Sequence, residues 1–137
     1  MMVILRLFTL LLLLAPIASA DSILAGTSLL GGIVDSLAGQ SSPVQILLPP
    51  NSCPGHYDMR PADVEKAAKC DLLMIQPWQE KMPNVAGLIR AAELPPERVV
   101  VVGVPGNWML PENRLKAIAA TAACLIKRYP AQQADIA

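Results

Sequence analysis

Short apolar segments alternate with segments of helical periodicity along most of this chain, and that alternation limits the folds open to it. Residues 99–102 are four consecutive valines, which predicts a buried strand. Residues 44–48 and 72–75 are similar apolar runs, and a shorter one covers residues 22–25. An amphipathic segment follows each of them. Four strand–helix pairs in this order predict an α/β domain with a mostly parallel four-stranded sheet flanked by helices.

Residue types at the segment ends predict where the helices begin. Ser28 is placed to cap the first helix, and Pro61 suits the first turn of the second. A long last helix is expected from Glu112 to Arg128, whereas residues 76–79 are expected to form a loop. Ligands of parallel sheets bind outside the carboxyl ends of the strands. A site is therefore expected among the loops at that edge, which are residues 26–28, 49–60, 76–79 and 103–110.

The first twenty residues have the pattern of a secretory signal. Arg6 is followed by the leucine-rich residues 7–14, and Ala18-Ser19-Ala20 is a small-residue cleavage pattern. A membrane anchor is the alternative, but this run is shorter than the roughly 20 apolar residues that span a bilayer. We therefore expect a signal peptide over residues 1–20, followed by one domain that begins near residue 21. The mature chain would lie in the periplasm or outside the cell.

The charge balance argues against two classes of partner. Without Arg6, ten basic side chains face eleven acidic ones, and neither sign is clustered. Binding to nucleic acid or to a membrane surface would call for a basic patch, so neither is expected. The three cysteines, Cys53, Cys70 and Cys124, are an odd number for an exported protein, and no disulfide is predicted from them.

The single histidine, His56, lies in the proline-rich loop after the second strand. A neutral imidazole is a common ligand of divalent transition metals, and Cys53, three residues earlier, could add a thiolate. Alternatively, His56 fixes the turn through hydrogen bonds, and Cys53 is a packing or incidental thiol. A third interpretation is a Cys53–His56 nucleophile pair oriented by Asp58.

The residues around His56 and Trp108 carry a resemblance to a known family. Its first motif is matched by the apolar residues 46–48, the proline-rich loop with His56, Pro61-Ala62-Asp63 and Cys70-Asp71-Leu72-Leu73. Its second motif, Asp-Pro-His-x-Trp-Leu-Asp-Pro-Glu-Asn at the start of a helix, is matched by residues 104–113, VPGNWMLPEN. In these features the chain resembles the N-terminal lobe of periplasmic zinc- and manganese-binding proteins of ABC importers. Such proteins consist of two lobes joined by a helical backbone.

Three departures from that family pattern bear on the site. Gly55 precedes His56 in place of a proline, and the spacing from His56 to Pro61 is one residue shorter than in the common form. Gly106 stands where the family has its second metal-binding histidine, although Asn107 could offer an amide oxygen. The resemblance also covers only one lobe, over roughly 110 residues.

The resemblance implies an exported solute-binding component that captures a divalent cation, zinc or manganese, for an ABC transporter permease. Its α/β solute-binding lobe would cover residues 21–130, and residues 131–137 would be a tail or the start of a missing backbone helix. His56 is then the expected metal ligand, and the metal is a transported solute. No catalytic residues are expected. Two other functions stay open: a non-metal solute-binding or interaction domain that has lost the metal site, and a thiol enzyme using Cys53 and His56.

Overall fold

The computed structural model describes residues 22–39 and 42–136, so the predicted signal peptide lies outside the described residues. Four strands form a single sheet: β1 (Ile23–Ala25), β2 (Val44–Ile46), β3 (Leu72–Ile75) and β4 (Val99–Val101). All three strand pairs are parallel, and the order across the sheet is β2-β1-β3-β4. This confirms the predicted α/β class and the parallel four-stranded sheet.

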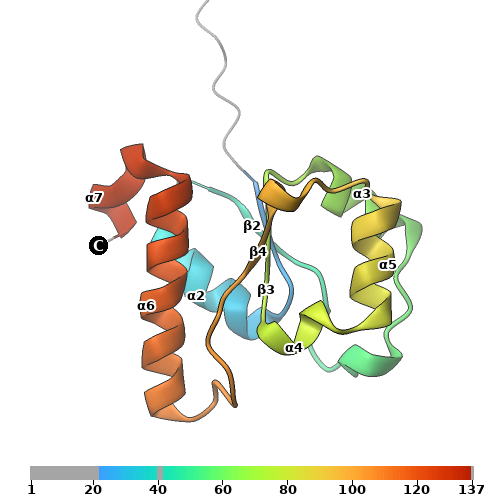
Figure 1. The fold of residues 1–137 in the computed structure, drawn as a ribbon, viewed down its shortest axis with the longest axis horizontal. Coiled ribbons are helices and arrows are strands. Elements are labelled where there is room, and N and C mark those ends of the chain that lie inside the picture. Colours follow the sequence, from blue (N-terminus) through green and yellow to red (C-terminus); the bar gives the residue numbers. More distant parts are fainter. Residues whose placement is uncertain (1–21, 40–41, 137) are drawn as a thin grey trace, which may run out of the picture.

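Helices cover both faces of the sheet (Figure 1). On one face lie α2 (Ser28–Ala38), α6 (Pro111–Arg128) and the short α7 (Gln133–Ile136). On the other lie α3 (Pro61–Lys69) and α5 (Pro83–Ala91). The one-turn helix α4 (Pro77–Glu80) sits at the carboxyl edge of the sheet. Three 3-10 turns complete the described part of the chain: η3 (Pro54–His56), η4 (Pro96–Arg98) and η5 (Pro130–Gln132).

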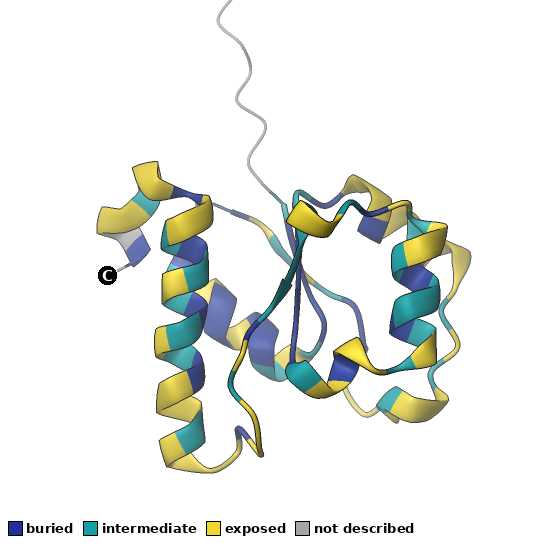
Figure 2. Ribbon diagram, viewed as in Figure 1, coloured by how far each residue is buried: buried dark blue, intermediate teal, exposed yellow. Residues whose placement is uncertain are grey.

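Alternation along the two central strands divides the interior into two cores. In β3, Leu72 and Met74 face α2 and α6, whereas Leu73 and Ile75 face α3 and α5. The α2/α6 core also holds Leu30, Trp108 and Leu125, and the α3/α5 core holds Leu24, Val85 and Leu88. Figure 2 shows the buried residues along the sheet-facing sides of the helices. Both faces of β3 are thus covered, as expected for a central parallel strand.

Two local predictions were wrong. Thr27, and not Ser28, caps α2: its backbone is extended and its hydroxyl accepts a hydrogen bond from the Leu30 amide at 3.2 Å. Residues 76–79 are not a loop, because α4 begins at Pro77. The Gln79 side-chain oxygen accepts from the Gln76 amide at 3.0 Å, which closes this single turn.

The length of the described helices and the state of the three cysteines complete the description of the fold. Among residues 22–39 and 42–136, no helix is both long and apolar enough to cross a bilayer. All three cysteines are free: Cys53 is exposed, Cys70 is buried and Cys124 is half-buried against the α2/α6 core.

Candidate functional site

His56 lies at the end of η3, in the loop that leaves the edge strand β2 at the carboxyl side of the sheet. Both His56 and Cys53 are exposed to solvent. The 3-10 turn brings them together, since residues three apart in such a turn lie above one another. The Cys53 Sγ atom is 3.3 Å from His56 Nδ1. Cys53 is therefore neither a packing residue nor distant from the predicted ligand.

Hydrogen bonds hold this loop to two helices. The Asn84 side-chain amide, in the first turn of α5, donates to the carbonyls of Pro54 at 2.8 Å and Tyr57 at 2.9 Å. The Tyr57 hydroxyl donates to the Asp63 carboxylate of α3 at 2.9 Å. Asp63 is buried and also accepts from the Arg60 amide at 3.0 Å. The loop carrying His56 is thus anchored on both of its sides.

The electrostatics of the loop follow from these contacts. The hydrogen bond to the His56 imidazole lowers the pKa of the Cys53 thiol, with help from the backbone at Gly55. Desolvation, and then the hydrogen bond to Asp63, raises the pKa of Tyr57. Asp58, the residue predicted to orient a catalytic histidine, is exposed. In the described parts of the chain, no hydrogen bond joins it to His56.

A polar network that the sequence did not reveal lies at the carboxyl ends of β1 and β3. In the order β2-β1-β3-β4 the connections diverge at this point, which is where open α/β sheets bind ligands. Gln79 is fully buried there and donates to the Gly26 carbonyl at 3.1 Å. Thr27 donates to the Gln76 side chain at 3.1 Å. A Cβ at Gly26 would overlap the Gln79 amide group, so a glycine is required beside it.

The loop after β4 does not supply the second ligand that the family pattern contains. Gly106 has no side chain, and its φ of 90° is one that other residues rarely adopt. The Asn107 side-chain oxygen accepts from the Met109 amide at 2.8 Å, so it is used within its own turn. Trp108 is buried, and its ring N–H donates to the Val104 carbonyl at 2.8 Å. Neither Asn107 nor Trp108 is therefore placed as a ligand.

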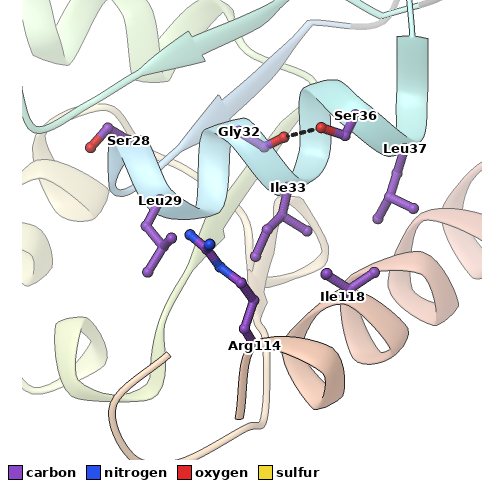
Figure 3. Close-up of a pocket in the computed structure, with 8 residues that line it drawn as sticks. All are labelled: Ser28, Leu29, Gly32, Ile33, Ser36, Leu37, Arg114 and Ile118. Atoms are coloured by element: carbon purple, nitrogen blue, oxygen red, sulfur yellow. Dashed lines mark hydrogen bonds between the residues drawn. The ribbon is translucent and has the colours of Figure 1, made fainter. Parts of the chain in front are cut away.

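Two of the open grooves in the described part of the chain are considered for this edge. One, of 540 Å³, runs between α4 and the loop after β4 and is lined by Trp78, Lys81 and Gly106 among others. The Trp78 residue is 41% exposed there, unlike buried Trp108. The other, of 370 Å³, lies between α2 and α6, where Arg114 reaches from α6 toward the first turns of α2 (Figure 3). Its remaining walls are mostly Leu29, Ile33, Leu37 and Ile118. Neither groove contains His56.

The potential metal donors of the described chain do not form a complete cage. Among residues 22–39 and 42–136, no group of three or more His, Cys, Asp or Glu side chains is close enough to hold an ion. Cys53 and His56 therefore stand as a pair.

Comparison with known proteins gives matches of structure without matches of sequence. No family model matches the chain, and no curated protein is significantly similar to it in sequence. The periplasmic zinc binding protein TroA from Treponema pallidum superposes with a TM-score of 0.71 at 18% identity, over 86% of this chain and 48% of that one. Zn(II)-bound AdcA from Streptococcus pneumoniae gives 0.69 at 18% identity, over 86% and 28%. Fe(III)-bound YtgA from Chlamydia trachomatis gives 0.70 at 19% identity, over 84% and 46%.

The chain has the fold of one lobe of these metal-binding proteins. It spans about half of their length or less, which agrees with the single lobe expected from the sequence. At these identities the likeness shows the fold alone, so the role of His56 has to be argued from its own surroundings.

Proposed function

We propose that the chain is the metal-capturing lobe of an exported solute-binding protein that serves an ABC importer. In this function it binds a divalent cation of the zinc or manganese type and passes it to a membrane permease. The single observation that carries the proposal is the position of His56. An exposed imidazole stands in the loop after β2, at the carboxyl edge of a sheet shared with zinc- and iron-bound proteins.

The site implies weak capture by this lobe alone. Tight structural zinc sites use four protein ligands, and catalytic ones use three. Here the described residues bring only Cys53 to the side of His56. Further ligands would have to come from a second lobe or from water. Because so few ligands are present, we expect a dissociation constant for zinc of about 1 µM or weaker. A dissociation constant of 1 µM corresponds to a binding free energy of about 8 kcal/mol.

Calorimetric titration of zinc into the mature protein tests this function. The expected result is weak binding that is lost in His56→Ala. Unchanged binding in His56→Ala would remove His56 as a ligand. Binding far tighter than micromolar that depends on His56 would contradict capture by one incomplete lobe. Gly32→Ala is a matched control, because that exposed helical glycine has open space around it and lies on α2.

The loop after β4 favours a second candidate, a solute-binding or interaction domain that has lost the metal site. Gly106 brings no ligand, and Asn107 is engaged in its own turn. Elemental analysis of the protein purified from its native source separates the two functions. Bound zinc or manganese supports metal capture, whereas a metal-free protein that also gives no heat with either ion supports the second candidate.

A thiol enzyme is the remaining alternative, and the contact between Cys53 and His56 is the observation in its favour. Such an enzyme also needs a group that orients the histidine, and Asp58 makes no hydrogen bond to it in the described structure. The proteins whose structures superpose on this chain, such as AdcA and TroA, are metal-binding proteins. Metal capture is therefore the function that we favour.

A further inference from the structure

Cys53 and His56 are adjacent metal-binding side chains, and their separation is close to what a shared ion would require. In a tetrahedral zinc site with a zinc–sulfur distance of about 2.3 Å and a zinc–nitrogen distance of about 2.1 Å, the two donors lie about 3.6 Å apart. The observed distance from Sγ to Nδ1 is 3.3 Å. A small rotation of either side chain would open the pair to the spacing of a chelate.

The pair sits where an ion could reach it. Both side chains are exposed, so two coordination positions of a bound ion would face solvent or a further lobe. The turn is also held in place before any ion binds. Asn84 donates to Pro54 and Tyr57 on either side of Gly55 and His56, and the His56 amide donates to the Cys53 carbonyl at 3.1 Å. Little backbone ordering would be required on binding.

The donor types decide which ions fit. Thiolate and imidazole suit zinc and its heavier relative cadmium, whereas manganese is better served by carboxylates, carbonyls and water. No aspartate or glutamate joins Cys53 and His56 to make a group of three within the described chain. We propose that Cys53 and His56 together form a two-donor site that binds a thiophilic divalent cation, zinc in preference to manganese. This inference rests on the proposed function and names the class of its cargo.

The geometry also indicates which ring nitrogen of His56 would coordinate the ion. Because Nδ1 faces the sulfur, Nδ1 is the nitrogen that joins the shared ion, and Nε2 carries the remaining ring proton toward solvent. Binding breaks the S–H bond and forms a sulfur–metal bond, so one proton leaves for the buffer when the thiol was protonated. No change of oxidation state is involved.

Cadmium is the first probe, because a thiolate bound to it gives an ultraviolet charge-transfer absorption that imidazole and carboxylate ligands do not give. The reduced mature protein is titrated with Cd²⁺, Zn²⁺ and Mn²⁺ in turn. Absorption should develop with Cd²⁺ in the wild type and be absent in Cys53→Ser. Zinc affinity should fall about tenfold or more in Cys53→Ser, while manganese binding should not change. Cys124→Ser is the matched control, since its half-buried thiol on α6 is remote in the fold and should leave all three titrations unaltered.

The outcomes separate this inference from the function on which it rests. Zinc binding that requires His56 but is unchanged in Cys53→Ser, with no charge-transfer band, overturns the chelate and leaves metal capture intact. Absence of binding by all three ions overturns both. A charge-transfer band that persists in Cys53→Ser assigns the ion to another thiol and also overturns the chelate. Circular dichroism of each variant checks that the substitutions leave the fold unchanged.

Nuclear magnetic resonance tests the assigned nitrogen. The chain contains a single histidine, so its two ring nitrogens can be followed without ambiguity in ¹⁵N-labelled protein. On adding zinc, the Nδ1 resonance should shift to the metal-bound range while Nε2 keeps its proton. Metal binding at Nε2 would contradict the shared site, because that nitrogen is not the one facing the sulfur.

Discussion

The contact between Cys53 and His56 makes one of the three thiols chemically distinct. The imidazole lowers the pKa of Cys53, whereas burial raises the pKa of Cys70. Since the thiolate is the reactive form, alkylation of Cys53 should persist to lower pH than alkylation of an ordinary cysteine. Its rate should then decline as pH falls through the lowered pKa.

Residue-resolved mass spectrometry of iodoacetamide labelling across a pH series checks this first prediction. In His56→Ala the midpoint for Cys53 should move to higher pH, because its hydrogen-bond partner is gone. Buried Cys70 provides the slow internal reference. An identical midpoint in the wild type and in His56→Ala would show that the imidazole does not act on this thiol.

Gln79 is a second residue whose role depends on its exact partners. It is fully buried, donates to the Gly26 carbonyl and accepts from the Gln76 amide. We expect Gln79→Ala to reduce the free energy of unfolding by about 2 kcal/mol, since the buried Gln76 amide loses its partner and the Gly26 carbonyl keeps only a longer bond, of 3.4 Å, from the Leu48 amide. Exposed Gln45 on β2 is the matched control, and Gln45→Ala should change stability by less than about 0.5 kcal/mol.

Gly26 should be energetically coupled to Gln79. Gly26→Ala places a methyl group onto the Gln79 amide and should cost about 1–3 kcal/mol through overpacking. In a Gln79→Ala background the space is vacant, so the same substitution should cost much less. Urea denaturation of the two single variants and the double variant measures this coupling. Strictly additive losses would mean that the two residues do not compete for the same space.

At the scale of elements, the order of strands and helices was readable from the sequence, but several local contacts were not. Apolar runs and helical periodicity predicted the sheet because burial on both faces leaves a continuous apolar signature. The sequence alone did not distinguish Thr27 from Ser28 as the cap, since either hydroxyl is suitable and the choice depends on the backbone angles. α4 was missed because a single turn has no periodicity to detect.

The candidate site was predictable to the same limited degree. The position of His56 follows from its place after β2, and the structure puts it where expected, with its role still a prediction. Asn84 and Gln79 were overlooked because they act on residues about 30 and 53 positions away. Such contacts depend on tertiary packing, and no local sequence pattern indicates them. The contact of Cys53 with His56 was not predicted, because the sequence alone does not determine whether residues 54–56 form a 3-10 turn.

Asn84 links α5 to the candidate site, and this gives a prediction at the element scale. Asn84→Ala removes both hydrogen bonds to the His56 loop, so amide exchange of the loop should accelerate and zinc affinity should fall. Asn113→Ala is the matched control. It removes a similar 3.1 Å bond from a side-chain amide to a loop carbonyl, that of Asn107, in the loop after β4. Equal effects of the two variants on zinc affinity would show that the α5 anchor has no special role.

At the scale of the whole molecule, the two cores share one sheet and should unfold together. β1 and β3 contribute residues to both cores, so loss of packing on one face weakens the strands that support the other. Leu88→Ala in the α3/α5 core should cost about 2–5 kcal/mol. The fluorescence of Trp108, which is buried in the α2/α6 core, should report the same midpoint as circular dichroism.

These measurements are best made in a Trp78→Phe background, so that buried Trp108 is the only fluorophore of its kind. Leu115→Ala is the matched control, since that leucine is 69% exposed and should matter little. Two separate transitions in Leu88→Ala would contradict a single cooperative unit.

The two ends of the sheet's carboxyl edge differ in what they can offer a cation. His56 follows one edge strand, β2, and Gly106 follows the other, β4, with β1 and β3 between them. Gly106→His would therefore introduce a second imidazole at this edge. The backbone opposes it, because a φ of 90° is strained for any residue with a Cβ. That Cβ would also lie 3.1 Å from the Asn113 side-chain amide.

We expect Gly106→His to lower the free energy of unfolding by about 1–3 kcal/mol and to leave zinc affinity within about twofold of the wild type. Gly103→His is the matched control, because that exposed glycine has open space where a Cβ would be placed. Thermal denaturation and zinc calorimetry on both variants measure the two quantities. Unchanged stability together with much tighter zinc binding in Gly106→His would mean that the loop after β4 rearranges readily. The glycine alone would then account for the incomplete site, with no part played by the conformation of the loop.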